Sequence, residues 1–141
     1  MVVVVYSDGC CLNYGKPNAY AGIGVAFRDY PQYNISDILT GRQTNNRAEI
    51  VAAIAAMEQC ERKGFYAIIL RTDSDILYKT VTKWYADWKR RGWLKPDEQP
   101  PENLDDLHRL MNLKASLNVT FQHVTAHSNV PGNEEADSLC K

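Results

Sequence analysis

The stretch TNNRAEIVAAIAAM, Thr44 to Met57, decides the fold because it joins two parts of the sequence with different patterns. Thr44 or Asn45 can cap a helix, and large apolar residues recur behind them at helical spacing with alanines between. Basic residues followed by Gly64 mark the end of this helix. Its first turns also carry two amides, an arginine and a lone acid, Glu49, none of which apolar packing requires.

Three apolar segments before the helix are typical of strands. They are Val2–Tyr6, which leads into the turn residues Ser7-Asp8-Gly9, then Ala21–Arg28, and the weaker Tyr33–Gly41. Because short polar connections link these segments, we expect them to form an antiparallel meander.

After the helix, strands alternate with further helices. We expect strands at Ala67–Leu70, which ends at Thr72-Asp73-Ser74, and at Val119–His123, and helices at Ser74–Thr80, from there to about Arg91, around Leu104–Met111 and at Asn133–Cys140. A meander joined to such β–α–β units implies a mixed sheet with helices packed on it. The sequence therefore predicts an α/β fold in a single domain, residues 1–141.

The composition is that of one globular domain with its own core. Of the 141 residues, 45% are apolar, and no repeat or linker divides them. The apolar start MVVVVY lacks a basic leader, and nothing approaches a membrane-spanning length, so we expect a soluble protein. The four cysteines show neither metal-ligand spacing nor a disulfide framework, which favours reduced thiols inside a cell. The chain starts directly at the first expected strand, which leaves open that it belongs to a longer protein.

The distribution of charge says more about a partner than the net charge of −1, which alone argues against nucleic acid. The segment Lys79–Lys95 holds six basic residues and one acid, Asp87, a local charge of +5. Three tryptophans, Trp84, Trp88 and Trp93, are interleaved with these charges. Such a segment is typical of a surface that binds nucleic acid.

Four acids stand at the ends of expected elements. Asp8 and Asp73 follow two strands whose ends lie about 5 Å apart if the strands are parallel neighbours. Glu49 is one turn into the crossover helix, and Asp137 is in the last helix. Each alone has a structural explanation as a turn residue, a cap, a helix-dipole partner or a surface residue. Asp75 lies past the end of its strand and is left out of the group.

Considered together, the four acids favour a metal site. Clustered carboxylates repel one another, which raises their pKa values and costs stability, and a divalent cation relieves that cost. Ligation by oxygen alone suits Mg²⁺ or Mn²⁺ rather than zinc. Sites of this kind hold two ions that serve phosphoryl displacement.

Six motifs carry a resemblance to a known family. They are YSDGCC, AGIGVAF, GRQTNNRAE, RTDSD, WYADWKRRGW and HVTAHSNVPGNEEAD. In this order, over nearly the whole chain, the sequence resembles the ribonuclease H family, specifically type 1 enzymes of eukaryotic character. The resemblance implies a five-stranded mixed sheet whose first three strands are antiparallel, and hydrolysis of the RNA strand of RNA–DNA hybrids that leaves 5′-phosphate and 3′-hydroxyl ends. It also implies that Asp8, Glu49, Asp73 and Asp137 are catalytic and bind two Mg²⁺ ions, for which Mn²⁺ can substitute.

The resemblance extends to contacts with the hybrid. Asn45, Asn46 and the peptide groups of Cys10 and Cys11 look like the family's contacts to 2′-hydroxyls in the minor groove, although Asn45 alone can also be a helix cap. Arg42 and Thr44 resemble a pocket for a phosphate of the DNA strand. Two departures are Pro100, about where relatives carry an asparagine for that phosphate, and Tyr14, where an asparagine is usual. For Arg47 the default interpretation is a surface ion pair.

The segment Lys79–Lys95 looks like the family's basic protrusion. Its basic residues, among them Lys89, Arg90 and Arg91, would follow phosphates, and Trp84 would line the channel for the DNA strand. Trp88, four residues later, we expect to pack inward, and Trp93 is left undecided.

Of three histidines, His127 is the candidate for chemistry. It lies in a loop ten residues before Asp137, which is the spacing of the family's mobile histidine, and we assign it proton transfer or product release. His108 and His123 lie in expected elements and are interpreted as structural.

Two other function classes stay open at this point. One is a module that binds hybrids without cutting them, and the other is nuclease or transposase chemistry on DNA alone. The favoured interpretation is a monomeric, metal-dependent endonuclease acting on RNA–DNA hybrids, with no membrane partner and no small-molecule cofactor. The family resemblance implies an intracellular location, in the nucleus or a mitochondrion.

Overall fold

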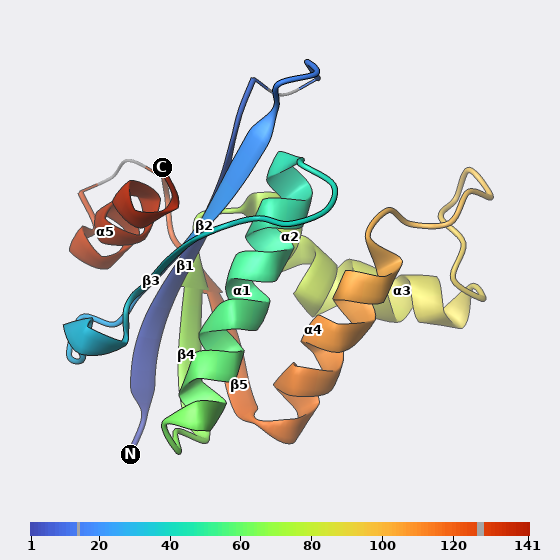
Figure 1. The fold of residues 1–141 in the computed structure, drawn as a ribbon. Helices are drawn as coiled ribbons and strands as arrows, with labels where there is room; N and C mark the ends of the chain where they lie inside the picture. Colours follow the sequence, from blue (N-terminus) through green and yellow to red (C-terminus); the bar gives the residue numbers. More distant parts are fainter. Residues whose placement is uncertain (14, 127–128) are drawn as a thin grey trace.

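The structure is a computed structural model of the chain, and it describes residues 1–13, 15–126 and 129–141. A five-stranded sheet of order β3-β2-β1-β4-β5 forms its centre (Figure 1). The strands are β1 (Val3–Leu12), β2 (Tyr20–Ala26), β3 (Ile35–Ile38), β4 (Ala67–Thr72) and β5 (Asn118–His123). The first three are antiparallel, whereas β4 runs parallel to both β1 and β5. The mixed sheet predicted from the sequence is confirmed.

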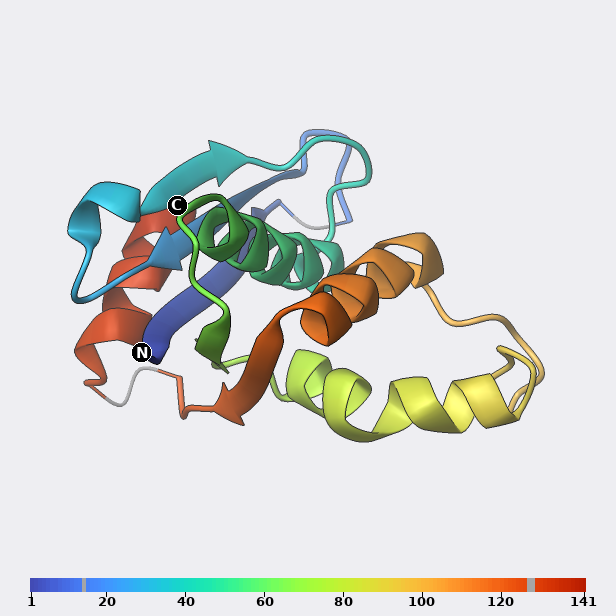
Figure 2. The same ribbon diagram turned by 90° about the horizontal axis from the view of Figure 1, so that it is seen from below.

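Helices cover both faces of this sheet. They are α1 (Asn45–Arg62), α2 (Asp75–Lys79), α3 (Tyr85–Arg90), α4 (Leu104–Ser116) and α5 (Pro131–Cys140). Figures 1 and 2 show α1 and α4 on one face and α5 on the other, with α3 projecting to the side. A π-helical turn, Thr80–Trp84, joins α2 to α3, and a short 3₁₀ turn, Pro31–Tyr33, precedes β3.

The alternation of side chains along β1 supplies residues to both faces. Val3 and Val5 are buried in the main core with α1, whereas Tyr6 packs with Ala26 and Ala136 in a smaller cluster under α5. Because side chains alternate along a strand, Asp8 lies on the same face as Tyr6.

The first strand is longer than its sequence pattern predicts. It continues through the expected turn Ser7-Asp8-Gly9 to Leu12, because its outer half keeps pairing with β2 as far as Tyr20. Its pairing with β4, by contrast, stops at Ser7 opposite Thr72. The prediction that β1 ends before Asp8 is therefore wrong for the strand as a whole, but Asp8 is the first residue beyond the parallel ladder.

Side-chain caps fix the starts of two helices, one that carries candidate site residues and one that directly follows Asp73. The Thr44 hydroxyl accepts a hydrogen bond of 3.2 Å from the Arg47 amide, which makes Thr44, rather than Asn45, the cap of α1. Ser74 caps α2 by accepting a 3.1 Å bond from the Leu77 amide. In the described part of the chain, the helices lack the length and apolar character that crossing a membrane requires.

Candidate metal centre and nucleic-acid interface

Three of the candidate acids meet where the parallel ladder ends. Asp8 and Asp73 directly follow Ser7 and Thr72, the last residues that pair β1 with β4. Carboxylate oxygens of Asp8, Glu49 and Asp73 lie within 4.8 Å of one another. Asp8 is only 4% exposed, so the group is set into the protein rather than spread over its surface.

Glu49 reaches this group because α1 touches β1 directly at Gly9. A Cβ atom at Gly9 would lie 2.3 Å from the carbonyl carbon of Ala48, so only glycine allows this contact. The Glu49 carboxylate accepts a hydrogen bond from the Gly9 amide. One backbone contact thus fixes the distance between a strand acid and a helix acid.

Asp137 joins the group from the opposite face of the sheet. A carboxylate oxygen of Asp137, one of Asp8 and the Cys140 sulfur lie within 4.8 Å of one another. The helix α5 comes this close because β2 presents glycines: a Cβ at Gly24 would lie 2.1 Å from the Ala136 carbonyl oxygen. The Lys141 ammonium lies 3.0 Å from the Asp137 carboxylate.

Asn133 is a site residue that the sequence patterns did not single out. It is 2% exposed, and its amide nitrogen donates a 3.3 Å hydrogen bond to the Asp73 carboxylate. Its side-chain oxygen has no hydrogen-bond partner among the described residues. Its position one helical turn before Asp137 is the signal that places both on one face of α5.

Burial and mutual repulsion set the electrostatics of the group. Burial, and then the neighbouring Glu49 and Asp73 carboxylates, raise the pKa of Asp8 to about 9. Burial, together with Asp73, raises the pKa of Glu49 to about 7, against the lowering effect of the Gly9 hydrogen bond. These carboxylates therefore resist holding their charges together in the folded protein.

The donor set fits a hard divalent cation. Oxygen ligands around Mg²⁺ stand 2.0–2.1 Å from the ion, so neighbouring ligands are about 3 Å apart, and the 4.8 Å grouping needs only a small contraction. A cation there would offset the repulsion that raises the pKa values. Asp75 is exposed and pairs with Lys79 at 2.8 Å, consistent with its exclusion. His127 and Tyr14 lie outside the described residues, so their roles stay predictions.

The residues expected to contact 2′-hydroxyls lie on the same two elements as Glu49 and Asp8. Asn45 and Asn46 are exposed on the first turn of α1 and line a shallow depression with Thr44 and Glu102. Cys10 and Cys11 lie in the outer half of β1, beyond the end of the β4 ladder, and pair there with β2. Along this half of β1, the edge that faces away from β2 therefore pairs with no other strand of the described sheet.

A clamp around Arg47 holds the loop that carries Arg42. The Arg47 guanidinium pairs with Asp106 at 3.0 Å and donates to the carbonyl oxygens of Thr40 and Arg42. Its side chain is 17% exposed, so the interpretation as an ordinary surface ion pair is too weak: Arg47 joins the loop before α1 to α4.

Asn103 supplies the amide beside Arg42. The Arg42 guanidinium donates a hydrogen bond to the Asn103 side-chain oxygen, whereas Pro100 is exposed in the preceding loop. Asn103 adopts a left-handed backbone conformation, φ 60°, immediately before α4. The departure noted at Pro100 therefore does not leave Arg42 without a neighbouring amide, because residue 103 provides one.

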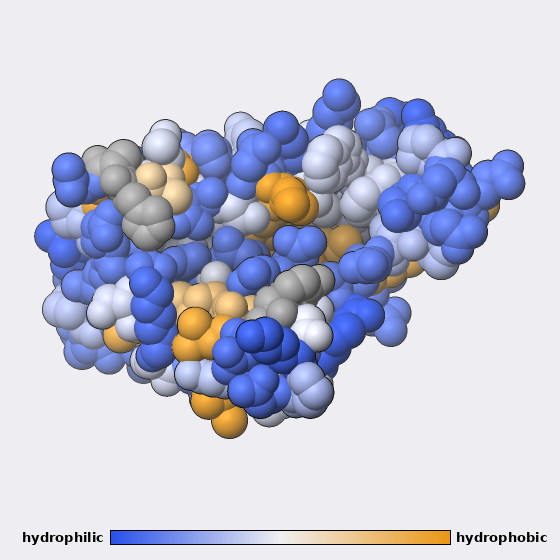
Figure 3. Space-filling view, turned by 90° about the horizontal axis from the view of Figure 1, so that it is seen from above, coloured by the Kyte–Doolittle hydropathy of each residue, from blue (hydrophilic) through white to orange (hydrophobic). Residues whose placement is uncertain are grey.

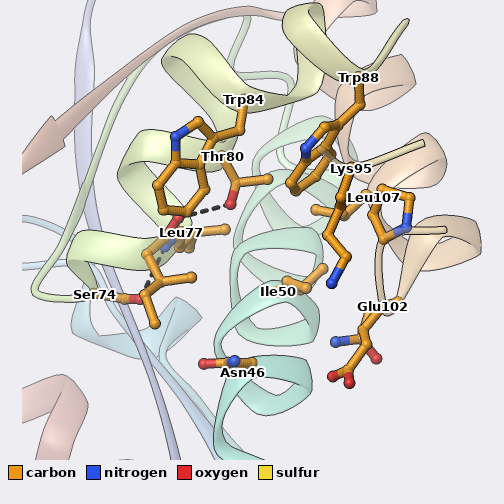
Figure 4. Close-up of a pocket in the computed structure, with 13 residues that line it drawn as sticks. Asn46, Ile50, Ser74, Leu77, Thr80, Trp84, Trp88, Lys95, Glu102 and Leu107 are labelled. Atoms are coloured by element: carbon orange, nitrogen blue, oxygen red, sulfur yellow. Dashed lines mark hydrogen bonds between the residues drawn. The ribbon is translucent and has the colours of Figure 1, made fainter. Parts of the chain in front are cut away.

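The tryptophans and most of the basic side chains of the protrusion, Lys79–Lys95, lie in different surroundings. Trp84 and Trp88 line a pocket of 190 Å³ with an apolar floor formed by Ile50, Leu77 and Leu107 (Figure 4). Trp88 is half-buried and also packs against the main core, as its spacing predicts, and Trp93 contacts His108 edge-on with ring centroids 4.6 Å apart.

Three basic side chains lie on the outside of the protrusion, whereas Lys95 lines the pocket beside the two tryptophans (Figure 4). Lys89, Arg90 and Arg91 are exposed, and Arg90 also pairs with Asp87. Seen from above, hydrophilic residues cover the projecting end, and apolar residues show between it and the body of the molecule (Figure 3).

Known proteins are similar to this chain in fold and in sequence. The crystal structure of LC9-RNase H1, described as a type 1 RNase H with the type 2 active-site motif, superposes with a TM-score of 0.78 at 27% identity over 99% of this chain and 70% of that one. Ribonuclease H1 of Rattus norvegicus is 39% identical, and that of Homo sapiens 40%, each over 99% of this chain and 49% of the relative.

The fold and the acidic group thus define an RNase H-like domain, and the family is settled by the sequence. The RNase H family model matches residues 1–141, so the chain belongs to the RNase H family. The family predicted from the motifs is confirmed, and the rat and human relatives are consistent with type 1, eukaryote-like character. The chain spans about half the length of these two relatives.

Proposed function

We propose that residues 1–141 are one catalytic domain that cuts the RNA strand of RNA–DNA hybrids internally, leaving 5′-phosphate and 3′-hydroxyl ends. The observation that carries the proposal is the meeting of carboxylates from β1, α1, the end of β4 and α5 at one place. Membership of the RNase H family, and curated relatives named ribonuclease H1, support the same activity.

The acids would hold two Mg²⁺ ions, for which Mn²⁺ can substitute. The proposed ligands are Asp8, Glu49, Asp73 and Asp137. Ions bound there supply an activated water and stabilise the leaving oxygen of the scissile phosphate. The chain itself orients the ligands: the Gly9 amide holds Glu49, and the Asn133 amide holds Asp73. His127 would carry protons or assist product release, since histidine titrates near neutral pH.

The surface around the acids would distinguish RNA from DNA. Asn45, Asn46 and the peptide groups of Cys10 and Cys11 would meet 2′-hydroxyls, the feature that separates the two strands of a hybrid. The exposure of Asn45 and Asn46, one turn before Glu49 on α1, supports this role. The minor groove of the hybrid would then lie across the open half of β1.

The DNA strand would contact a different part of the surface from the RNA strand. Arg42 and Thr44, with Asn103 added because it contacts Arg42, would hold one of its phosphates. Trp84 would line its path, and Lys89, Arg90 and Arg91 would meet phosphates further along. By family resemblance we place this monomeric domain in the nucleus or a mitochondrion, working without a small-molecule cofactor.

A cleavage assay tests the proposal directly. A hybrid labelled in its RNA strand should be cut with Mg²⁺ and stay intact with EDTA, while duplex DNA and duplex RNA of the same sequence should stay intact in both. Metal-dependent binding without cutting would instead support a binding module. Cutting of duplex DNA would support a DNA nuclease.

A further inference from the structure

Two thiols lie directly beside the candidate catalytic acids. The Cys140 sulfur is within 4.8 Å of carboxylate oxygens of both Asp8 and Asp137. The Cys10 thiol donates a hydrogen bond to the Cys140 carbonyl oxygen, and the Cys140 thiol donates one to the Asp137 carbonyl oxygen. Carboxylates and thiols thus share one site.

Backbone contacts hold these four side chains together. Asp8 and Cys10 are two residues apart on β1 and therefore lie on the same face of the sheet. Cys10 pairs with Gly22, where a Cβ atom would lie only 2.1 Å from the Cys140 carbonyl oxygen. Because the glycine lets the end of α5 rest on β2, Cys140 is fixed against Cys10 by the main chain.

This donor set differs in kind from the carboxylates expected to bind Mg²⁺. Two sulfurs and two oxygens form the tetrahedral set that zinc accepts, with bonds of about 2.3 Å to sulfur and about 2.0–2.2 Å to oxygen. The donors of such a tetrahedron lie about 3.5 Å apart, so Asp8, Asp137 and Cys140, grouped within 4.8 Å, would have to close by little more than an ångström. The Cys10 sulfur, 2.6 Å from the Cys140 carbonyl oxygen, would have to turn towards them as the fourth donor. Thiolates favour zinc strongly over Mg²⁺, which takes oxygen ligands.

We propose a zinc-binding site made of two thiols and two carboxylates: Cys10, Cys140, Asp8 and Asp137. Zinc there uses two of the acids that catalysis needs, so zinc and the catalytic Mg²⁺ ions exclude each other, and zinc is an inhibitor. The inhibition rests on the proposed function, whereas the binding of zinc does not. Binding releases the thiol protons to the buffer, since zinc takes thiolates.

Binding is tested without substrate by titrating the chain with Co²⁺ or Cd²⁺, whose bonds to thiolates give charge-transfer absorption, in a buffer with a phosphine reductant. The wild type should show this band, and Zn²⁺ should displace it. Cys140→Ala should lose the band and bind Zn²⁺ at least about 10-fold more weakly. The matched control is Cys60→Ala, since Cys60 is buried in the main core, and it should keep the band.

The inhibition is tested by adding Zn²⁺ to hybrid cleavage at constant Mg²⁺. The wild type and Cys60→Ala should be inhibited alike, and Cys140→Ala should need at least about 10-fold more Zn²⁺ while keeping its turnover with Mg²⁺ alone. Cys140→Ser repeats both tests with a side chain of similar size, and melting temperatures establish that each variant is folded.

Failures of the two proposals are distinguishable. A wild type without a thiolate band, or a band that survives in both Cys140 variants, overturns the zinc site even if hybrids are cut normally. A chain that shows the band and loses it in Cys140→Ala, but cuts no hybrid with Mg²⁺, supports the zinc site and overturns the catalytic proposal. Equal inhibition of the wild type and folded Cys140 variants overturns the exclusion of Mg²⁺ by zinc.

Discussion

The acidic end of the sheet and the protrusion are built in different ways. At the acidic end, main-chain contacts at Gly9 and Gly24 fix each helix against the sheet. The protrusion instead depends on rings: Trp93, held at the unusual φ of 69°, packs on Tyr85 and His108. Catalysis tolerates little displacement, whereas following a flexible strand of phosphates does not need the same precision. Changes at the acidic end should therefore affect turnover, and changes in the protrusion should affect binding.

The largest effect is expected at Asp8. Asp8→Asn keeps the shape of the side chain but removes a charge that the metals need, so kcat should fall at least about 1000-fold, the equivalent of several kcal/mol. His127→Ala should lower kcat by a smaller factor, because it removes a proton carrier and no ligand. Steady-state cleavage at saturating Mg²⁺ and saturating hybrid measures both. Equal losses would contradict this division of roles.

A smaller but still large loss of turnover is expected from Gly24→Ala. The new methyl group would meet the Ala136 carbonyl oxygen at 2.1 Å, so α5 must move and carry Asp137 with it. A displacement of about 1 Å near the chemistry costs about 100-fold in kcat. The control is Gly15→Ala, where a Cβ meets no atom within 4 Å. It should lose about 1–2 kcal/mol of stability from its left-handed backbone and keep its kcat.

In the protrusion, the comparison predicts the opposite kinetic signature. The triple variant Lys89→Ala, Arg90→Ala, Arg91→Ala should raise KM about 10-fold with a smaller change in kcat, because its charges are exposed, lie away from the acids and would contact only phosphates of the hybrid. The dependence of KM on salt should also flatten. A loss confined to kcat, or an unchanged salt dependence, would remove the protrusion from the proposed path of the DNA strand.

The smallest effect concerns stability and pH. The folded pKa values of Asp8 and Glu49, about 9 and about 7, exceed their ordinary values of 3.8 and 4.5. At pH values between the ordinary and the folded pKa values, the unfolded chain releases protons that the folded chain keeps. The free energy of unfolding therefore falls as the pH rises. In EDTA the melting temperature should drop by several degrees between about pH 5 and about pH 8. Mg²⁺ should reduce this drop, since it binds the ionised folded form, and Asp8→Asn should reduce it without metal.

Much of the fold follows from the sequence because it depends on local patterns. The helical spacing after Thr44 and the β-branched runs predict the elements, and two strands joined through one helix predict that Asp8 and Asp73 lie together. The prediction that β1 ends at Ser7-Asp8-Gly9 is wrong because this tripeptide is also a good turn sequence. Only the register with β2, a long-range property, keeps this segment extended.

The remaining site residues escaped prediction for the same physical reason. Asn103 and Asn133 act through contacts with Arg42 and Asp73, which are distant in the sequence. Cys140 shows no ligand spacing to any other cysteine, and the glycine at position 22 alone does not reveal which main chain will rest on it. Spacing along the chain predicts elements, but close approach of two backbones creates this part of the site.

The alternation along β1 also limits how this protein can change over time. Tyr6, Asp8 and Cys10 occupy the α5 face, whereas Gly9 faces α1 and touches its backbone. Inserting or deleting one residue just before Asp8 would exchange the two faces. After an insertion the Asp8 carboxylate would meet the backbone of Ala48, and after a deletion the Cys10 side chain would meet it. In both cases Gly9 would lie on the α5 face. Residues along this strand can be substituted, but the number of residues around Asp8 must stay the same. Alignments with related sequences should therefore show no gap there.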